Sequence, residues 1–183
     1  MHGSPDASDW VRRWSHLVAA GGSVLDVACG RGRHLRWFAA RGCRVCGVDR
    51  DATALEASNG LGELVVADIE NGPWPFTGRR FDAVIVTNYL WRPLMPSIVA
   101  ALAEGGVLMH ETFAIGNEHH GRPSNPAFLL RPGELLMLAD GLRVVAFEEG
   151  FLDDPPRVVQ RIVALREPQG GPAKIARLQG QPE

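Results

Sequence analysis

The chain has 183 residues, of which 45% are hydrophobic and 22% are charged, and its formal net charge is -2. This length and composition predict one globular domain with a single core, and the near-neutral charge argues against a nucleic-acid partner. The sequence has no run of about 18 apolar residues, so no membrane span is predicted. The N-terminus lacks the basic and apolar regions of a secretory signal. Three cysteines, an odd number, suit a reducing compartment, so we expect a cytoplasmic protein.

The first predicted helix covers residues 10–20. Its apolar side chains recur at helical spacing on one stripe: Trp10, Val11, Trp14, Leu17 and Val18. Such a stripe normally packs on a sheet, which is the interpretation we favour. The alternative is that the helix places Trp10 or Arg13 near a ligand. Gly21 and Gly22 would end the helix.

The segment from residue 23 to residue 34 has the pattern of a strand, a glycine turn and the start of a helix. The apolar run over residues 24–27 predicts a short buried strand, and residues 33–40 have a helical pattern. Between them, Gly30 and Gly32 permit φ > 0 and a close approach of a ligand to the backbone. The free N–H groups at the start of the helix attract a carboxylate or a phosphate.

The second predicted strand covers residues 43–48 and places Asp49 at its carboxyl end. This acid follows the glycine turn by about 20 residues, the separation at which a βαβ unit sets a carboxylate beside a ribose. A dinucleotide site requires a third glycine where this chain has Leu35, so a ligand with a ribose but no phosphates fits better. Cys43 and Cys46 have C-x-x-C spacing, but a strand points them to opposite faces, and we interpret them as packing residues.

The rest of the chain alternates strands and helices, with Asp68 directly after the third strand. The predicted strands are residues 64–67, 81–87, 107–113, 142–147 and 158–165, and the predicted helices are residues 51–59, 93–103 and 131–140. The long loop over residues 114–132 has a length that is usually functional, and its apolar residues hint at a lid. Its adjacent His119 and His120 rarely ligate one ion, and no third ligand has a recognisable spacing, so we predict no metal site.

Residues 26–32, Asp-Val-Ala-Cys-Gly-Arg-Gly, resemble the first motif of class I S-adenosylmethionine (SAM)-dependent methyltransferases. Ala28 stands where that motif usually has its first glycine. The motif in this chain is similar to the version in small bacterial methyltransferases of the tellurite-resistance type.

The resemblance implies an α/β fold, a Rossmann-like three-layer αβα sandwich. Its seven-stranded sheet would be mostly parallel, with an antiparallel last strand. Residues 10–166 would form a single methyltransferase domain, and residues 1–9 and 167–183 would be flexible termini. Glycine, proline and glutamine dominate the C-terminal segment, as is typical of a mobile tail.

The resemblance also implies which residues hold SAM, with S-adenosylhomocysteine (SAH) as the product. Asp26 and the glycine turn would bind the methionine part, Asp49 the ribose hydroxyls, and Asp68 with Ile69 the adenine. Carboxylates suit these partners because they accept hydrogen bonds from N–H and O–H groups. The expected cofactor-binding residues are Asp26, Ala28, Cys29, Gly30, Gly32, His34, Asp49, Arg50, Asp68, Ile69 and Thr87.

The methyl acceptor is expected beyond the fourth strand, where the sequence reads Asn88-Tyr89-Leu90-Trp91. Amino methyltransferases of nucleic acids or glutamine often carry N/D-P-P-Y/F there, so this segment points away from a DNA amino methylase. We predict in-line methyl transfer to a small-molecule acceptor with an oxygen, nitrogen, sulfur or other chalcogen nucleophile. A histidine would act as general base if the acceptor needs one, whereas a thiolate, chalcogen oxyanion or amine needs none. The candidate catalytic residues are Asn88, Tyr89, His110 and His119, and Trp91 and Glu111 are also expected on the acceptor side.

Two other functions stay open. An NAD(P)-dependent oxidoreductase is opposed by Leu35 and by the predicted closing hairpin. A non-catalytic protein that binds SAM or a nucleotide would keep the fold but bind the cofactor weakly or leave no room beside the sulfur.

Overall fold

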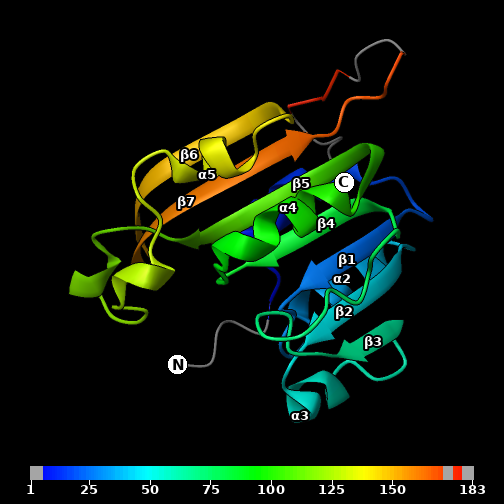
Figure 1. The fold of residues 1–183 in the computed structure, drawn as a ribbon, viewed down its shortest axis with the longest axis horizontal. Coiled ribbons are helices and arrows are strands. Elements are labelled where there is room, and N and C mark those ends of the chain that lie inside the picture. The colour runs from blue at the N-terminus through cyan, green and yellow to red at the C-terminus, as the bar shows by residue number, and fades with distance from the viewer. Residues whose placement is uncertain (1–5, 171–174, 179–183) are drawn as a thin grey trace.

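The computed structural model describes residues 6–170 and 175–178, and its centre is one seven-stranded sheet (Figure 1). The strand order is β3-β2-β1-β4-β5-β7-β6. The strands are β1 (Ser23–Val27), β2 (Arg44–Asp49), β3 (Glu63–Val66), β4 (Phe81–Thr87), β5 (Leu102–Phe113), β6 (Arg143–Asp153) and β7 (Pro156–Leu165). Strands β1 to β5 are parallel, and β7 lies antiparallel between β5 and β6. The predicted sheet is therefore confirmed.

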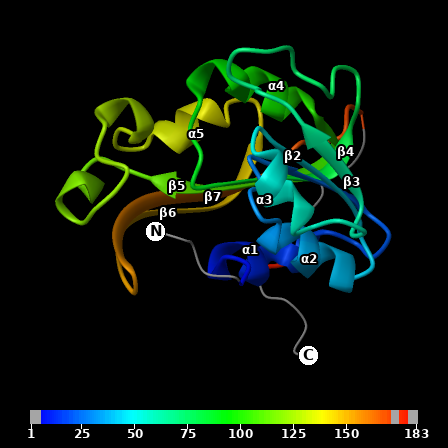
Figure 2. The ribbon, with the colours of Figure 1, turned by 90° about the horizontal axis from the view of Figure 1, so that it is seen from below.

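Helices cover both faces of the sheet and form the predicted three-layer sandwich (Figure 2). Helices α1 (Asp9–Trp14) and α2 (Arg33–Ala40) lie on one face, and α4 (Met95–Ala100) and α5 (Glu134–Leu138) lie on the other. Helix α3 (Ala52–Glu56) packs with α1 and α2. Single 3-10 turns are η1 (Ser15–Leu17), η2 (Arg92–Leu94), η3 (Asn117–His119) and η4 (Pro126–Phe128).

The alternation of side chains along β1 explains the two cores. Val24 packs with Trp10 and Phe38 on the α1–α2 face, and Leu25 packs with Ile98 on the α4 face. Successive residues of a strand point to opposite faces, so a central strand that is covered by helices on both sides is apolar at nearly every position. This is why β4 has the near-continuous apolar sequence from which it was predicted.

The closing hairpin is longer than predicted. Strands β6 and β7 pair as far as Asp153 and Pro156, whereas the prediction ended them at residues 147 and 158. The extra pairs include the polar residues Glu148 and Glu149, which are held by backbone hydrogen bonds and not by burial. A hydrophobicity pattern therefore does not detect them.

Strand β5 begins earlier than predicted, and the predicted helix before it is correspondingly shorter. Gly105 has a φ of 72°, and the register between β4 and β5 shifts in this region, so the double glycine forms an irregular part of the strand. Helix α1 ends at Trp14, short of the predicted residue 20, and the chain continues as the 3-10 turn η1.

Part of the predicted C-terminal tail lies against the N-terminal helices. Ala176 packs against the α1–α2 core, and the carbonyl oxygen of Arg177 lies 2.9 Å from His16 Nε2. Residues 1–5, 171–174 and 179–183, which the prediction of flexible termini also covers, lie outside the described residues. Within the described ranges, no helix is long and apolar enough to cross a membrane.

Leu35 of α2 and Gly47 of β2 share one space between helix and sheet. Leu35 is fully buried, and a Cβ added to Gly47 would lie 2.7 Å from Leu35 Cδ1 and 2.8 Å from Cys29 Sγ. The dinucleotide motif places its small residue on the helix to allow close packing on the strand. In this chain the bulky residue is on the helix, and the glycine is on the strand.

We predict that Gly47→Ala destabilises the fold by about 1–3 kcal/mol, which is typical of overpacking. Leu35→Ala alone should destabilise it by about 2–5 kcal/mol because it leaves a cavity. The double variant should lose less than the sum of the two, since the shorter side chain at position 35 frees space for the new methyl group. Urea unfolding measures these free energies, and strictly additive values would contradict the shared space.

Candidate active site

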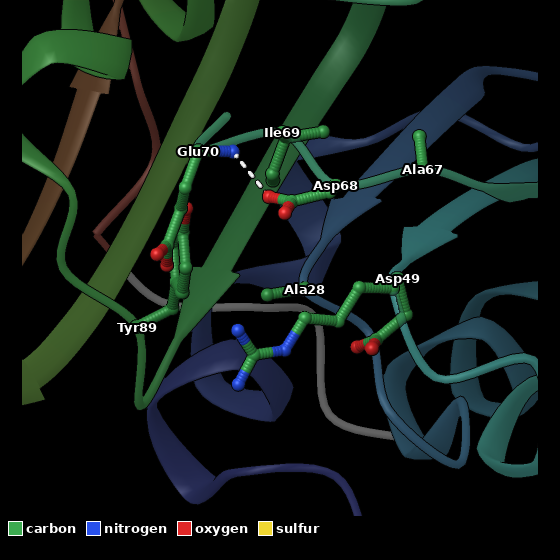
Figure 3. A pocket seen from close by; sticks show the side chains of 8 residues that line it. Ala28, Asp49, Ala67, Asp68, Ile69, Glu70 and Tyr89 are labelled. Carbon is green, nitrogen blue, oxygen red and sulfur yellow. Dashed lines mark hydrogen bonds between the residues drawn. The ribbon is translucent and has the colours of Figure 1, made fainter. Parts of the chain in front are cut away.

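A pocket of ≈ 180 Å³ lies at the carboxyl ends of strands β1 to β4 (Figure 3). It is at the point where the strand order reverses between β1 and β4, the place where open α/β sheets bind their ligands. Four segments that are far apart in the sequence line it: Ala28, Asp49, Arg50, Ala67, Asp68, Ile69, Glu70 and Tyr89. All of these except Ala67 and Glu70 are among the residues predicted from the sequence.

The turn after β1 contains three residues in the left-handed conformation. Ala28, Gly30 and Gly32 have φ values of 54°, 52° and 69°. A Cβ on Gly32 would also collide with the side chain of Ser58, whose hydroxyl donates a hydrogen bond to the carbonyl of Arg31 at 3.0 Å. Glycine is therefore required at position 32 by both conformation and space, whereas Ala28 bears a strain of about 1–2 kcal/mol.

Asp49 holds this turn and also faces the pocket. The Gly30 N–H donates to Asp49 Oδ2 at 2.7 Å, and the Asp51 N–H donates to Oδ1 at 2.9 Å. A carboxylate has about four acceptor positions, so two remain for a ligand. Asp49 can thus fix the turn and still accept hydrogen bonds from ribose hydroxyls.

Asp68 lines the pocket and also has a structural role. It caps the following turn, because Oδ1 accepts from the N–H groups of Glu70 and Asn71 at 3.0 and 3.1 Å. The Asn71 side chain donates to Oδ2 at 2.9 Å, and these hydrogen bonds, the side-chain one foremost, lower the pKa of Asp68. The ionised carboxylate lies in the pocket wall next to Ile69, which is mostly buried.

Tyr89 lies in the same pocket wall, beside Glu70 (Figure 3). Burial of the phenol, and then the negative charge of Glu70, raise the pKa of Tyr89 above its usual range. The hydroxyl therefore stays protonated, and the ring serves as an aromatic wall. The structure groups Tyr89 with the residues expected to bind adenosine, although the sequence placed it on the acceptor side.

The side chains of Asn88 and Tyr89 lie in different surroundings because the backbone of Asn88 is left-handed, with a φ of 55°. Its N–H donates to the carbonyl of Glu111 at 2.9 Å, which fixes the end of β4 to β5. Its side chain is exposed at the carboxyl edge of the sheet. Apart from Tyr89, which lines the pocket, Asn88 is more open to a ligand than Trp91, which is half-buried against the α4 core.

Asp26 and His34 lie behind the turn and not in the pocket. Both side chains are 1% exposed, and His34 Nδ1 lies 3.5 Å from Asp26 Oδ2. The Ser8 N–H donates to His34 Nε2 at 3.3 Å, which assigns the ring proton of a neutral imidazole to Nδ1, facing Asp26. His34 therefore orients Asp26 and anchors the N-terminal segment.

The two histidines predicted as possible bases do not meet in the pocket. His110 is fully buried, its Nε2 lies 3.2 Å from the carbonyl oxygen of Tyr89, and burial lowers the pKa of His110 to about 4. His119 has a side chain that is 78% exposed on η3, 3.8 Å from Glu118. Neither ring lies among the residues that line the pocket.

Two further predicted residues are occupied by structural contacts. Glu111 is 3% exposed, accepts a hydrogen bond from Ser8 Oγ at 3.1 Å and pairs with Arg161 at 3.5 Å. Cys29 is buried in the turn, and burial raises the pKa of its thiol, so it stays protonated and packs as a small side chain. Among the described residues, no group of three or more His, Cys, Asp or Glu side chains could hold a metal ion.

Arg33 lies beside the glycine turn and was not singled out from the sequence. It is the first residue of α2, and its guanidinium reaches Thr87 at the end of β4, with 3.4 Å between Nη2 and Oγ1. The signal for it was present, since a basic side chain directly after the glycine turn is well placed for an anion. Thr87, which was predicted to bind the cofactor, is thus a neighbour of Arg33.

The sequence from residue 24 to residue 106 matches the family model described as a methyltransferase domain. It runs from β1 into β5 and includes every residue that lines the pocket. Residues 24–106 are therefore similar to a methyltransferase domain. No curated protein is similar enough to the chain to count as a match.

Solved structures with a similar fold match most of the chain. A TehB-like SAM-dependent methyltransferase from Corynebacterium glutamicum is 20% identical with a TM-score of 0.65, and the match covers 87% of this chain and 88% of that one. TehB from Haemophilus influenzae is 18% identical with a TM-score of 0.67, over 91% and 63% of the two chains. Coclaurine N-methyltransferase, solved with N-methylheliamine and SAH, is 14% identical with a TM-score of 0.62, over 82% and 69%. The family model supports the predicted methyltransferase class, and these neighbours share the predicted fold.

Two substitutions at Ala28 should distinguish the effect of backbone strain on stability from the effect of pocket space on ligand binding. Ala28→Gly relieves the left-handed strain and should keep SAH affinity within about twofold, with a stability change of at most about 1 kcal/mol. Ala28→Leu extends the side chain into the pocket that Ala28 lines and should abolish binding. Calorimetric titration with SAH and thermal unfolding measure the two effects. Unchanged affinity in a folded Ala28→Leu protein would contradict the position of the cofactor.

The buried His110 should make stability depend on pH. The unfolded imidazole takes up a proton near about pH 6.5, whereas the folded one does so near about pH 4, so stability falls as the pH drops between these values. The loss is up to about 3 kcal/mol. His110→Gln should flatten the free energy of unfolding between pH 7 and pH 5, as urea titrations at several pH values would show. An unchanged slope would contradict a neutral, buried imidazole.

Proposed function

We propose that the protein transfers the methyl group of SAM to a small nucleophilic acceptor by in-line displacement, within a single domain over residues 10–166. The observation that carries this proposal is the pocket at the reversal of strand order, which combines the Asp49 carboxylate, the glycine turn and the Asp68–Ile69 segment. These groups match a ribose, a backbone-bound amino-acid part and an adenine in turn. The free thiols of Cys29, Cys43 and Cys46 support a cytoplasmic location.

The residues of this chain would act by binding and orienting. When bound, SAM supplies an electrophilic methyl group on a sulfonium, which leaves as neutral SAH. Asp49 accepts hydrogen bonds from the ribose, Asp68 accepts one from the adenine amino group, and Ile69 with Tyr89 covers the ring and excludes water. Asn88 presents an exposed amide at the end of β4 that can hold the acceptor atom in line.

The acceptor that fits this site is one that is nucleophilic without a base. His110 is buried and neutral, and His119 is exposed on η3, so neither is held against the pocket. A thiolate, a chalcogen oxyanion or an amine brings its own lone pair. The fold neighbour coclaurine N-methyltransferase, by its name, acts on an amine, which supports this class of acceptor.

The first test is calorimetric titration of the protein with SAM and SAH, alongside Asp49→Ala. We expect micromolar binding that Asp49→Ala weakens by about 10- to 100-fold, because it removes the charged acceptor for the ribose hydroxyls. Arg44→Gln, at an exposed position on the opposite edge of the sheet, is the control for a nonspecific effect. A folded protein that binds neither ligand would contradict the proposed function.

The second test measures SAH formation with a panel of thiols, amines and chalcogen oxyanions. With a thiol acceptor, kcat/KM should rise with pH along the titration of that thiol, and His119→Ala should leave the profile unchanged. Asn88→Ala should raise the KM for the acceptor with little effect on SAM affinity. A profile with an additional ionisation of an enzyme group, lost in His119→Ala, would show that a base is used. SAM binding without turnover of any acceptor would favour a non-catalytic binding protein.

A further inference from the structure

Arg92 joins the segment after β4 to the long loop over residues 114–132. Its guanidinium donates two hydrogen bonds to the Glu134 carboxylate, from Nε at 2.6 Å and from Nη2 at 2.9 Å. It donates two more to backbone carbonyl oxygens of the loop, from Nη1 to Ala127 at 2.7 Å and from Nη2 to Leu129 at 2.9 Å. A guanidinium suits this arrangement because its five N–H donors project in a fixed fork. One side chain therefore fixes both η4 and the start of α5.

The ion pair between Arg92 and Glu134 is partly shielded from water, since the two side chains are 30% and 12% exposed. The hydrogen bond from Arg92 lowers the pKa of Glu134, and the same contact raises the pKa of Arg92, so both groups stay charged. Paired hydrogen bonds between charged groups are stronger than neutral ones and fix the relative orientation of the two partners. The contact therefore does more than an exposed ion pair, which contributes little.

Apolar packing and backbone bonds add to this hold on the loop. Leu90, from the same segment as the arginine, lies in one buried cluster with Ala114 and Leu130. The Leu130 N–H donates to the carbonyl of Phe113 at 3.0 Å, and the Ile115 N–H donates to the carbonyl of Leu130 at 2.9 Å, so the end of the loop is paired with its beginning. Segments with buried apolar contacts and paired backbone open rarely. The loop, which the sequence suggested as a lid, is thus held in one place.

The loop begins at the edge of the sheet where the acceptor is expected. Strands β4 and β5 are adjacent and parallel, so the segment after β4 and the loop leave the sheet at the same edge (Figure 1). The Asn88 N–H donates to the carbonyl of Glu111 at 2.9 Å, and β5 ends shortly afterwards, at Phe113. The loop therefore borders the end of β4 on the side of β5, whereas the cofactor pocket lies on the side of β1.

The residues of this segment that face the cofactor pocket are held by other bonds. The carbonyl oxygen of Tyr89 lies 3.2 Å from His110 Nε2, and the N–H of Asn88 is bound to β5. Neither contact uses the Arg92 guanidinium. Loss of that guanidinium should therefore release the loop and leave the pocket as it is.

We propose that Arg92 is a positioning residue for the methyl acceptor, because it holds the loop over residues 114–132 as a fixed wall beside Asn88. The assignment rests on the proposed function and concerns the acceptor side of the same site. A fixed wall keeps the acceptor close to the end of β4, and such placement is the main contribution that a protein makes to an in-line transfer.

The test compares Arg92→Gln, Glu134→Gln and the double variant with the wild type. The matched control is Arg79→Gln, which also removes two hydrogen bonds to one carboxylate, both 2.8 Å long, but at Glu63 where β3 begins. Each protein is measured by hydrogen exchange of peptides from the loop, by SAH titration, and by the kcat and KM of methyl transfer to 4-nitrothiophenolate, a thiolate at neutral pH. Thermal unfolding verifies that each variant is folded.

Arg92→Gln should speed exchange in the loop by about 10-fold or more, because it removes the bonds that keep the loop closed. It should raise the KM for 4-nitrothiophenolate by about 10-fold, with kcat within about threefold and SAH affinity within about twofold, since the loss is in acceptor binding. Glu134→Gln keeps an acceptor oxygen without the charge, so it should change the same quantities less, and it covers the case in which Arg92→Gln does not fold. The double variant should resemble Arg92→Gln, because the two residues act through one contact. Arg79→Gln should leave all of these quantities unchanged.

Four results would overturn the assignment. Unchanged loop exchange in a folded Arg92→Gln protein would show that the loop is fixed without Arg92, and fast loop exchange in the wild type would show a mobile lid. Faster exchange with an unchanged KM would show that Arg92 has a structural role only. Weakened SAH binding would assign its effect to the cofactor pocket.

Failure of the proposed function would look different. A wild-type protein that binds SAH but does not methylate 4-nitrothiophenolate would remove the transfer to a thiolate and the acceptor role of Arg92 together. The exchange measurement uses no acceptor, so it would still show whether Arg92 fixes the loop.

Discussion

The hydrogen bond from the Gly30 N–H to the Asp49 carboxylate is the constraint on which the site depends. At 2.7 Å it joins the turn after β1 to the end of β2, and the bond from the Cys29 N–H to the Val48 carbonyl at 3.0 Å joins the same segments. Ser58 holds the other side of the turn through the carbonyl of Arg31. A backbone with several left-handed residues persists only when its surroundings fix it, and these bonds do so.

The same turn sets the direction of α2 and the position of its first residue. It directs α2 so that Leu35 enters the space left by Gly47, and the helix start carries Arg33 toward Thr87. Two features thus separate this site from a dinucleotide site on a related fold. The helix packs on the strand through a leucine, and its first residue is an arginine whose guanidinium reaches Thr87 at the end of β4.

The sequence was sufficient to predict the half of the sheet that β1 to β4 form and the residues that follow these strands. Strand β4 and helix α2 have their predicted bounds, because apolar runs and glycines mark both ends of each element. Asp49 and Asp68 meet in the pocket because parallel strands end at one edge of the sheet. The polar part of β6 was not predictable from hydrophobicity, since Glu148 and Glu149 pair with β7 through the backbone and are held by polar contacts, Glu148 with Arg161 and Glu149 with the Gly133 N–H.

The acceptor side was harder to predict because it depends on single backbone torsions and on tertiary cover. Sequence spacing treats Asn88 and Tyr89 as neighbours at one strand end, but the left-handed Asn88 sends their side chains to different surroundings. His110 ends the apolar part of β5, and only the packing around it shows that the ring is completely enclosed. A histidine near the correct edge of a sheet is therefore weak evidence for a base, whereas an acid directly after a strand is stronger evidence for a ribose.

Backbone strain gives an independent indication of where the chemistry takes place. Among the described residues, Ala28 and Asn88 are the two non-glycine residues with positive φ, and they follow the adjacent strands β1 and β4. Strained residues of this kind tend to occur at functional sites because the surrounding structure must stabilise them. Ala28 lines the pocket expected to hold the cofactor, and Asn88 presents its amide beyond the neighbouring strand. The reacting atoms are therefore expected between these two strand ends, where a fixed backbone can align donor and acceptor, and alignment is most of what an in-line methyl transfer requires of a protein.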